Sequence, residues 1–295
     1  MRIGALDFGG TAIKYGVWEA GQLTGLSERP SPTTCSKDVV EALTDIIGSL
    51  GKLDAVGIST RGQVDEHGAI LYDNGPVEDY TGTPLNALLE ARFGIPVWVE
   101  NDVNAAATGE AVCGAGREYG DFLCLTYGTG VGGAIIRDGC VYHGSSFSAA
   151  EFGAIVTHAE ARIDGRDFFD GCYERYASTT ALVKMAMAYK PELDNGRKIF
   201  ENLDDPNVFE ILDRWVDEIM LGLSTLTHIF NPTCIVLGGG IMVQPLIMEK
   251  IRSKVAKYIM PSFAHVAIKP AELGNTAGLL GANYLAVRHY QSANR

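Results

Sequence analysis

The sequence predicts an α/β protein of two similar lobes, each built on its own sheet. Three observations support this fold class. Short apolar strands are followed by glycine-rich turns at three places, the pattern of strand, turn and strand that opens the chain returns near its middle, and segments with helical apolar spacing lie between them. With 295 residues, the chain is long enough for each lobe to bury a core.

The composition excludes several classes of protein. Hydrophobic residues make up 46% of the chain, far too many for a disordered protein. The 24 basic and 36 acidic side chains give a net charge of −12, which argues against a nucleic-acid partner because such binders contact phosphates with Lys and Arg. Glycine is in excess, with 35 residues against the roughly 21 that an average usage of about 7% predicts.

The N-terminus and the cysteines indicate a cytoplasmic protein. The opening MRIGALDFGG leaves no room for the apolar core of a signal peptide. The six cysteines are scattered singly, without a C-x-x-C pair, as expected for reduced thiols. They are Cys35, Cys113, Cys124, Cys140, Cys172 and Cys234.

The stretch 219–248 holds no Asp, Glu, Lys or Arg and is long enough to suggest a membrane span. However, Asn231-Pro232 and the glycines at 238–240 interrupt it. We therefore expect the end of a core helix, a buried strand and a glycine turn there, and no membrane partner.

Apolar periodicity and turn residues predict the elements. We expect strands at 3–6, 13–18, 55–59, 96–100, 122–126, 132–137, 140–142, 233–237 and 266–270, with a further short strand after Gly21. We expect helices from an N-cap at Ser36 to residue 50 and at 103–113, 208–230, 246–259 and 277–289. One broad apolar face of the long helix 208–230 consists of Ile211, Leu212, Trp215, Val216, Ile219, Met220, Leu223 and Leu226.

The opening hairpin, LDFGGTAIKYGVWEAGQL, has a counterpart in the second half of the chain. There, strand 122–126, the turn Tyr127-Gly128-Thr129-Gly130 and strand 132–137 follow in the same order. The best offset pairs Gly9 with Gly128 and Val17 with Ile136. Identities are few but the architecture matches, which predicts duplicated lobes rather than a single sheet.

Three glycine turns, 7–11, 128–133 and 238–240, each follow a strand. A single such turn is usually only a hairpin or a bulge. Three together suit a polyphosphate held between two lobes, because glycine lets backbone N–H groups approach an anion and the hydroxyls of Thr11 and Thr129 add donors. The chain has no G-x-x-x-x-G-K-[ST] motif, so a Walker P-loop is not expected.

Five segments in this order resemble the ROK sugar kinases: DFGGT, VENDVNAAATGE, YGTGVGG, AAEFG and VLGGGI. The resemblance covers residues 3 to about 281. It implies the fold of the actin, Hsp70 and hexokinase superfamily, with two duplicated ribonuclease H-like lobes and a cleft between them. It also implies lobes at 1–118 and 119–282, and a terminal helix at 283–295 that returns to the first lobe. The first lobe would hold the sugar-binding and catalytic-base residues, and the second the nucleotide-binding turns.

The resemblance implies that Asp102 is the base that takes the proton from the sugar hydroxyl. On spacing alone, a plain helix N-cap is an equal reading of Asp102, and its neighbours Glu100, Asn101 and Asn104 favour catalysis. ATP and Mg²⁺ are the implied cofactors. Asp7 would lie on the metal side, through water, and Lys14 is a candidate near the phosphates or a solvated strand residue.

By the same resemblance, two sets of residues would bind the substrates. The sugar would contact Gly62 through its backbone, Asn74, Asn101, Asp102, Glu151 and Glu174, although an acid such as Glu151 or Glu174 beside aromatic residues can also be a plain surface group. The nucleotide would contact Asp7, Gly9, Gly10, Thr11, Lys14, Gly128, Thr129, Gly130, Gly238, Gly239 and Gly240.

The chain departs from the family at its zinc motif. Ala154 stands where most members have a His, and Gly165 and Asp167 replace the first two cysteines, so that only Cys172 is in place. One thiolate does not make a tetrahedral zinc site. We therefore expect no structural zinc, and because the missing His is also a sugar contact in the family, the usual glucokinase specificity is in doubt.

The predicted reaction is ATP-dependent phosphorylation of a hexose at a primary hydroxyl, O6. Loss of the zinc motif is similar to bacterial N-acetylmannosamine kinases and β-glucoside kinases. VWVENDVN and STRGQVD favour N-acetylmannosamine, whereas FLCLTYGTGVGG and AAEFG fit the β-glucoside branch equally well. Glucokinase or fructokinase activity is a further alternative. We also expect a homodimer, as is usual in the family.

The sequence argues against two other classes of function. A sugar-responsive ROK regulator would carry a helix-turn-helix ahead of the DFGGT-like strand, and here that strand begins at Ile3. A catalytically dead sugar-binding subunit is opposed by the intact Asp102.

Overall fold

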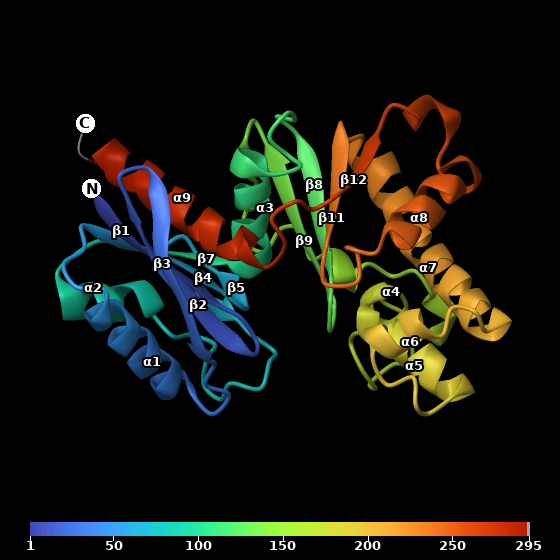
Figure 1. Ribbon diagram of the computed structural model, residues 1–295, viewed down its shortest axis with the longest axis horizontal. Helices are drawn as coiled ribbons and strands as arrows, with labels where there is room; N and C mark the ends of the chain where they lie inside the picture. The colour runs from blue at the N-terminus through green and yellow to red at the C-terminus, as the bar shows by residue number, and fades with distance from the viewer. Residues whose placement is uncertain (294–295) are drawn as a thin grey trace. The chain divides into compact units, whose positions relative to one another are not determined.

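The computed structural model describes residues 1–293, which divide into two compact units with two five-stranded sheets (Figure 1). Unit 1 comprises residues 1–117, 139–149 and 275 onward, and unit 2 comprises residues 118–138 and 150–274. These bounds differ from the expected lobes 1–118 and 119–282 because 139–149 and the segment from 275 pack in unit 1. Of the expected terminal helix 283–295, residues 294 and 295 lie outside the described residues.

The elements of unit 1 are β1 (Arg2–Phe8), β2 (Ala12–Glu19), β3 (Gln22–Pro30), α1 (Ser36–Ser49), β4 (Ala55–Thr60), β5 (Gln63–Val64), β6 (Ile70–Tyr72), α2 (Leu85–Phe93), β7 (Val97–Asn101), α3 (Asp102–Cys113), β10 (Cys140–Val141) and α9 (Ala277–Ala293). Those of unit 2 are β8 (Phe122–Tyr127), β9 (Val131–Arg137), α4 (Glu174–Ala177), α5 (Thr179–Tyr189), α6 (Gly196–Glu201), α7 (Pro206–Phe230), β11 (Cys234–Gly238), α8 (Pro245–Tyr258) and β12 (Ala267–Pro270).

The predicted duplication is confirmed by the strand orders. One sheet runs β3-β2-β1-β4-β7 and the other β10-β9-β8-β11-β12. In each, a central strand pairs antiparallel with the next strand along the chain and parallel with a later one, as β1 does with β2 and β4, and β8 with β9 and β11. The glycine turns at 9–11 and 128–130 are therefore the connecting loops of two equivalent hairpins.

Several predicted boundaries are wrong. Cys35, not Ser36, occupies the N-cap of α1, with extended backbone and no capping hydrogen bond from its side chain. The strand after Gly21 has nine residues rather than a short run. α3 begins at Asp102, one residue earlier than expected.

The sheet of unit 1 is covered on both faces. Helices α1 and α2 lie on one side of it and α9 on the other (Figure 1). Leu6 and Phe8 belong to the core that α1 and α2 complete, whereas Ile3 packs with Ala286 of α9. Since successive strand residues point to opposite faces, Asp7 lies on the α9 side. A Cβ on Gly278 of α9 would stand 2.7 Å from Asp7 Oδ1, so the helix closes directly over this carboxylate.

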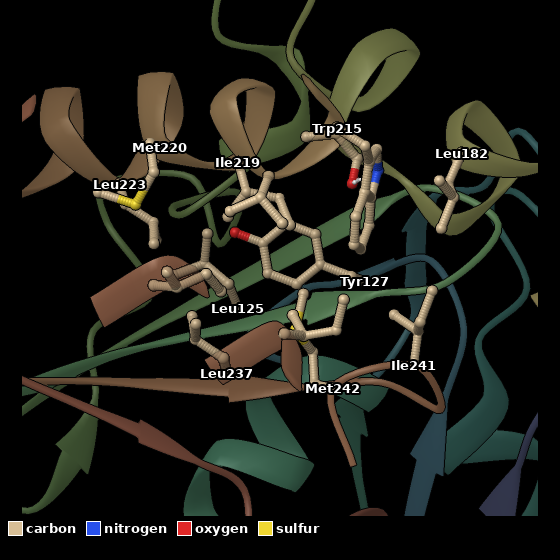
Figure 2. Close-up of a cluster of buried hydrophobic side chains, with 14 of the residues drawn as sticks. Leu125, Tyr127, Leu182, Trp215, Ile219, Met220, Leu223, Leu237, Ile241 and Met242 are labelled. Carbon is tan, nitrogen blue, oxygen red and sulfur yellow. Dashed lines mark hydrogen bonds between the residues drawn. The ribbon is translucent and has the colours of Figure 1, made fainter. Parts of the chain in front are cut away.

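The core of unit 2 lies between its sheet and α7 (Figure 2). All eight residues of the predicted apolar face of α7 are buried. Two polar groups within this core are satisfied: the hydroxyl of Tyr173 donates to the carbonyl of Ile219 at 2.8 Å, and the indole N–H of Trp215 donates to the carbonyl of Ser178 at 3.0 Å. Among the helices of residues 1–293, none combines the length and apolar character that crossing a membrane requires.

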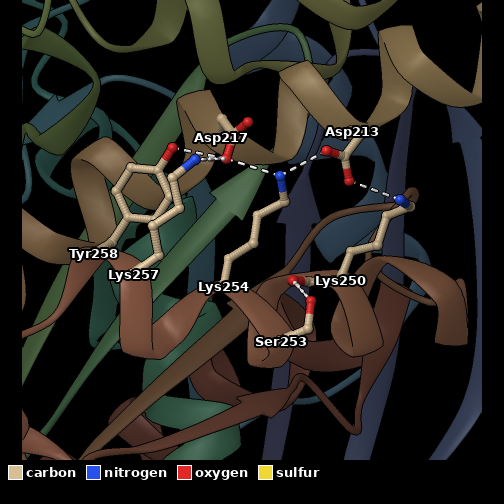
Figure 3. A network of polar contacts seen from close by, with 7 residues as sticks. All are labelled: Asp213, Asp217, Lys250, Ser253, Lys254, Lys257 and Tyr258. Atoms are coloured by element: carbon tan, nitrogen blue, oxygen red, sulfur yellow. Dashed lines mark hydrogen bonds and ion pairs between the residues drawn. The ribbon is translucent and has the colours of Figure 1, made fainter.

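Lys254 is the centre of an ionic network between α7 and α8 (Figure 3). Its Nζ lies 2.8 Å from both Asp213 Oδ2 and Asp217 Oδ1, and its side chain is only 13% exposed. Lys254→Met should lower the free energy of unfolding by about 1–2 kcal/mol, because two half-buried carboxylates lose their shared cation. Chemical denaturation measures the change.

Lys257→Met is the matched control, because Lys257 is 66% exposed and lies 3.5 Å from Asp217. It should cost less than about 0.5 kcal/mol. Equal losses for the two variants would contradict the central place of Lys254 in the network.

Candidate active site

Asp7 lies at the carboxyl end of the unit 1 sheet. β1 and β4 run parallel and pair Asp7 with Ser59, and the Ser59 hydroxyl donates to Asp7 Oδ1 at 2.7 Å. Burial raises the pKa of Asp7, while Ser59 and the charge of Lys14 oppose that rise. Lys14 faces Asp7 across the β1/β2 pair and donates from Nζ to the carbonyl of Asn275 at 2.9 Å.

Asn101 and Asp102 stand at the junction of β7 and α3, at the same end of the sheet. Asn101 is the N-cap: its Oδ1 accepts from the backbone N–H of Val103 at 2.9 Å and of Asn104 at 3.1 Å. The reading of Asp102 as the helix cap is therefore wrong, because Asn101 holds that position. Asp102 is the first helical residue, and its Oδ1 accepts from Asn101 Nδ2 at 3.0 Å.

The pKa of the Asp102 carboxyl differs strongly from that of an ordinary aspartate. Burial and the negative charge of Asp7 raise its pKa to about 6, against the opposing effects of the Val103 N–H, Arg61 and Asn101. Such a carboxylate is ionised at neutral pH and still basic enough to accept a proton. Perturbation by burial plus a like charge is typical of functional sites.

The loop after β4 closes on this junction. Gly62 has φ +82°, and its carbonyl accepts from Asn101 Nδ2 at 2.9 Å. Arg61 donates from Nε to Asp73 Oδ1 at 2.9 Å, and the N–H of Gly75 donates to the other oxygen of Asp73 at 3.1 Å. Asn74 lies between these anchors and is exposed.

Asp7, Gly62, Asn101 and Asp102 are thus brought together in unit 1. Ser59, Arg61 and Asp73 were missed by sequence reasoning. Ser59 and Arg61 stand in STRGQVD, beside the predicted Gly62, and the position after a buried strand was the available signal. Nothing local marked Asp73 as the partner of Arg61.

The first glycine turn is also in unit 1. The N–H of Gly9 donates to the carbonyl of Ala12 at 3.2 Å, and the Ser31 hydroxyl donates to the carbonyl of Gly9 at 2.6 Å. Gly10 and Thr11 are exposed at the tip, and a Cβ on Gly10 would meet nothing within 4 Å. The tip is therefore open to a ligand.

The second glycine turn belongs to unit 2. The N–H of Gly128 donates to the carbonyl of Gly130 at 3.0 Å, and the N–H of Thr179 donates to the carbonyl of Gly128 at 3.0 Å. The Glu174 carboxylate accepts from the backbone N–H of Val131, and burial raises its pKa. Glu151 is exposed just before a short 3₁₀ turn, and its charge also raises the pKa of Glu174.

A pocket of about 1040 Å³ opens beside this turn in unit 2. Gly128, Thr129 and Gly240 line it together with α5 and α6, which contribute Lys184 and Arg197. The helices and both cations were missed, because short amphipathic segments give weak periodicity.

The third turn shows a strict need for glycine. Gly239 has φ +107°, and a Cβ there would overlap the backbone of Tyr127. Gly238 ends β11 and is buried, whereas Gly240 is exposed and reaches the pocket. Gly239 thus lets this turn pack directly against the strand that leads into the second glycine turn.

The region that corresponds to the family's zinc motif lies in unit 2. Within residues 1–293, no group of three or more His, Cys, Asp or Glu side chains is placed to hold a metal ion. Cys172 is buried, and burial raises the pKa of its thiol. Ala154 ends a short 3₁₀ turn in the same unit. The absence of zinc stays a prediction.

Comparison with known proteins identifies the family. The ROK family model matches residues 3–289. A β-glucoside kinase from Listeria innocua is 30% identical over 292 residues, covering 96% of this chain and 97% of the relative. Two solved structures cover this chain almost completely. A ROK glucokinase from Streptomyces griseus, in complex with glucose and AMPPNP, has a TM-score of 0.83, 31% identity and coverage of 98% and 100%. The Lmo2764 protein of Listeria monocytogenes, described as an N-acetylmannosamine kinase on provisional grounds, has a TM-score of 0.88, 28% identity and coverage of 100% of both chains.

The chain belongs to the ROK family. Its fold is that of the solved ROK kinases, with two α/β units of like topology.

Proposed function

We propose that this protein transfers the γ-phosphoryl group of ATP to O6 of N-acetylmannosamine, with Asp102 as the general base. That the chain is a sugar kinase follows from its family and its relatives. What we propose beyond this is the identity of the sugar, of the hydroxyl that is phosphorylated and of the general base. The observation that carries it is the Asp102 carboxyl, raised in pKa to about 6 at the start of α3 beside Asp7.

The residues of unit 1 fit a sugar-binding role. The carboxylate of Asp102 and the amide of Asn101 are adjacent, and Asn101 is oriented by the Gly62 carbonyl. Such pairs grip neighbouring hydroxyls and place one of them against the base. We propose that Asn74 of unit 1 and Glu151 and Glu174 of unit 2 complete the sugar contacts.

In the proposed step, the O6 atom forms a bond to the γ-phosphorus while the bond from that phosphorus to the β-phosphate oxygen breaks. ADP leaves with that oxygen, and the O6 proton passes to Asp102. Because phosphoryl transfer needs mainly positioning and charge stabilisation, Asp102 is the one proton acceptor that the step requires, and the other residues position the substrates and neutralise charge.

The turns of unit 2 fit ATP. The pocket beside Gly128, Thr129 and Gly240 is large enough for a nucleotide, and Lys184 and Arg197 supply positive charge at its wall. We propose that the turn Gly9-Gly10-Thr11 and Lys14 of unit 1 also serve the phosphates. ATP as the donor is supported by the AMPPNP complex of the Streptomyces griseus relative.

Asp7 fits the role of a Mg²⁺-side acid. Its carboxylate is buried beside the like charge of Asp102, an arrangement that a cation would relieve. When bound, Mg²⁺ neutralises charge on the phosphates. We further propose that the protein is a cytoplasmic homodimer, as its six free cysteines and its family membership suggest.

The choice of N-acetylmannosamine is supported by the Listeria monocytogenes structure and by the small Ala154 where the family usually has a His. β-Glucosides, glucose and fructose are the alternatives. A coupled ADP-release assay should give N-acetylmannosamine a kcat/KM at least about tenfold above those of cellobiose, glucose and fructose. Turnover confined to glucose or fructose would sink the sugar assignment.

The pH dependence tests the base. A carboxyl with pKa about 6 carries the proton below that pH and cannot accept another, so kcat/KM should fall with unit slope as pH drops through about 6. Asp7→Asn removes the like charge and should move this limb to lower pH in whatever activity remains. A limb near the ordinary aspartate pKa of about 4 in the wild-type enzyme would contradict the assignment.

A further inference from the structure

Glu100, the residue before Asn101 on β7, holds the start of α3 with one buried carboxylate. Its side chain is 12% exposed. Its Oε1 accepts from the backbone N–H of Asn101 at 2.9 Å and from Asn104 Nδ2 at 3.0 Å. Asn101 and Asn104 flank Asp102 in the chain, so the carboxylate ties together the residues on both sides of the base.

The other oxygen of Glu100 is held by His143. The imidazole Nε2 donates to Glu100 Oε2 at 2.8 Å. His143 comes from the segment after β10, more than 40 residues from Glu100 in sequence, and both residues belong to unit 1. Burial of the carboxylate makes this partner important, because an unpaired buried charge is costly.

The His143 ring is itself fixed. The ring packs against that of Phe147 at 5.1 Å between centroids. The backbone carbonyl of His143 accepts from the N–H of Ala149 at 3.2 Å. The hydrogen bond to Glu100 raises the pKa of His143, with burial opposing. Together with Glu100, the ring forms part of the wall of a pocket of about 360 Å³ at the edge of the unit 1 sheet.

We propose that His143 is a positioning residue for the phosphoryl-transfer step, acting through Glu100 on the start of α3. His143 fixes the Glu100 carboxylate, Glu100 fixes Asn101 and Asn104, and Asn101 contacts both Asp102 and the Gly62 carbonyl. The inference rests on the proposed role of Asp102. It assigns to the segment 139–149, which sequence reasoning placed in the other lobe, a part in setting the geometry of the base.

The test compares three variants of the full-length protein. His143→Ala removes the donor, His143→Gln keeps an N–H donor of similar reach, and His67→Ala is the control. His67 lines the same pocket, but it is 81% exposed and pairs with Glu66 at 3.7 Å. The readouts are kcat and KM with the preferred sugar of the panel, and hydrogen exchange of the backbone amides of Val103 and Asn104.

We expect His143→Ala to lower kcat by about 10- to 100-fold, as for a displacement of a catalytic group by about 1 Å. KM for ATP should be unchanged, and the amides of the first turn of α3 should exchange faster. His143→Gln should recover most of the loss, and His67→Ala should match the wild type. Wild-type kcat in His143→Ala, or unchanged amide exchange, would overturn the proposal.

An Asp102→Asn variant assayed in parallel separates the two failures. If it keeps turnover, the proposed base is wrong. If it loses turnover while His143→Ala does not, the base stands and only the positioning role of His143 fails.

Discussion

Asp102→Asn should lower kcat by about 10²- to 10⁴-fold, the range that a general base contributes, while leaving sugar binding largely intact. The amide keeps the Oδ1 acceptor for Asn101 Nδ2 and the Val103 N–H, so the geometry of the α3 terminus is retained. The lost function is proton acceptance alone. Steady-state kinetics and isothermal titration with the sugar measure the two quantities, and turnover near the wild-type rate would remove Asp102 from the chemistry.

The same substitution should stabilise the folded protein at neutral pH. Folding raises the Asp102 pKa from its ordinary value of 3.8 to about 6, so the folded state holds the proton more tightly than the unfolded state does. The stability this provides is fully present below pH about 4 and is lost as pH rises through about 6. At pH 7 the ionised wild type therefore lacks up to about 3 kcal/mol that a neutral side chain would retain.

The control is internal: the stability difference between Asp102→Asn and wild type should vanish below pH about 4, where both side chains are neutral. A variant that is less stable than the wild type at pH 7 would show that Asp102 is not a strained, desolvated acid.

Gly281→Ala should destabilise the protein by about 3 kcal/mol or more. α9 crosses α3 at glycine contacts, and a Cβ on Gly281 would overlap the backbone carbonyl of Ala105. Alanine ordinarily favours a helix by about 1 kcal/mol over glycine, but backbone against backbone cannot yield as a flexible side chain can, so overpacking dominates. Because α3 begins with Asp102, kcat should also fall.

Gly48→Ala is the matched control. Gly48 lies near the end of α1, and a Cβ there would meet nothing within 4 Å. Its helix should gain roughly 0.5–1 kcal/mol from the substitution. The midpoints of thermal and denaturant unfolding should therefore fall for Gly281→Ala and rise for Gly48→Ala. A Gly281→Ala protein as stable as the wild type would contradict the close crossing of α3 and α9.

The architecture was largely predictable from the sequence because it is repetitive. The two hairpins and the long α7 have strong periodic signals, and their counterparts in the structure agree to within a few residues. The weak points were short or tertiary-dependent elements. α2, α4, α5 and α6 were not predicted, since their few turns are stabilised by packing rather than by an apolar stripe.

The placement of residues 139–149 in unit 1 was not predicted, and the return of the last helix was expected only from the family resemblance. Contacts between distant segments leave no periodic trace in either one.

The residues of the candidate site also fall into a predictable group and a group that depends on tertiary contacts. Asp7, Asn101 and Asp102 follow strands whose carboxyl ends share one edge of a sheet, so strand prediction and family resemblance together could place them. Ser59 and His143 act through partners 52 and 43 residues away, and Arg61 acts through a partner 12 residues away in the same loop region. A sequence does not display such contacts. The cap at Asn101 was misread for a simpler reason: both Asn101 and Asp102 have good capping side chains, and only the start of the helix decides between them.

The most direct test of the central claim is ³¹P NMR of the product formed from ATP, Mg²⁺ and N-acetylmannosamine. Transfer to O6 predicts a phosphomonoester whose phosphorus couples to the two protons of the C6 methylene group, together with one ADP for each product molecule. The Asp102→Asn protein should form almost none of it in the same time. A phosphoester on a ring hydroxyl, or equal product from the Asp102→Asn protein, would contradict the account.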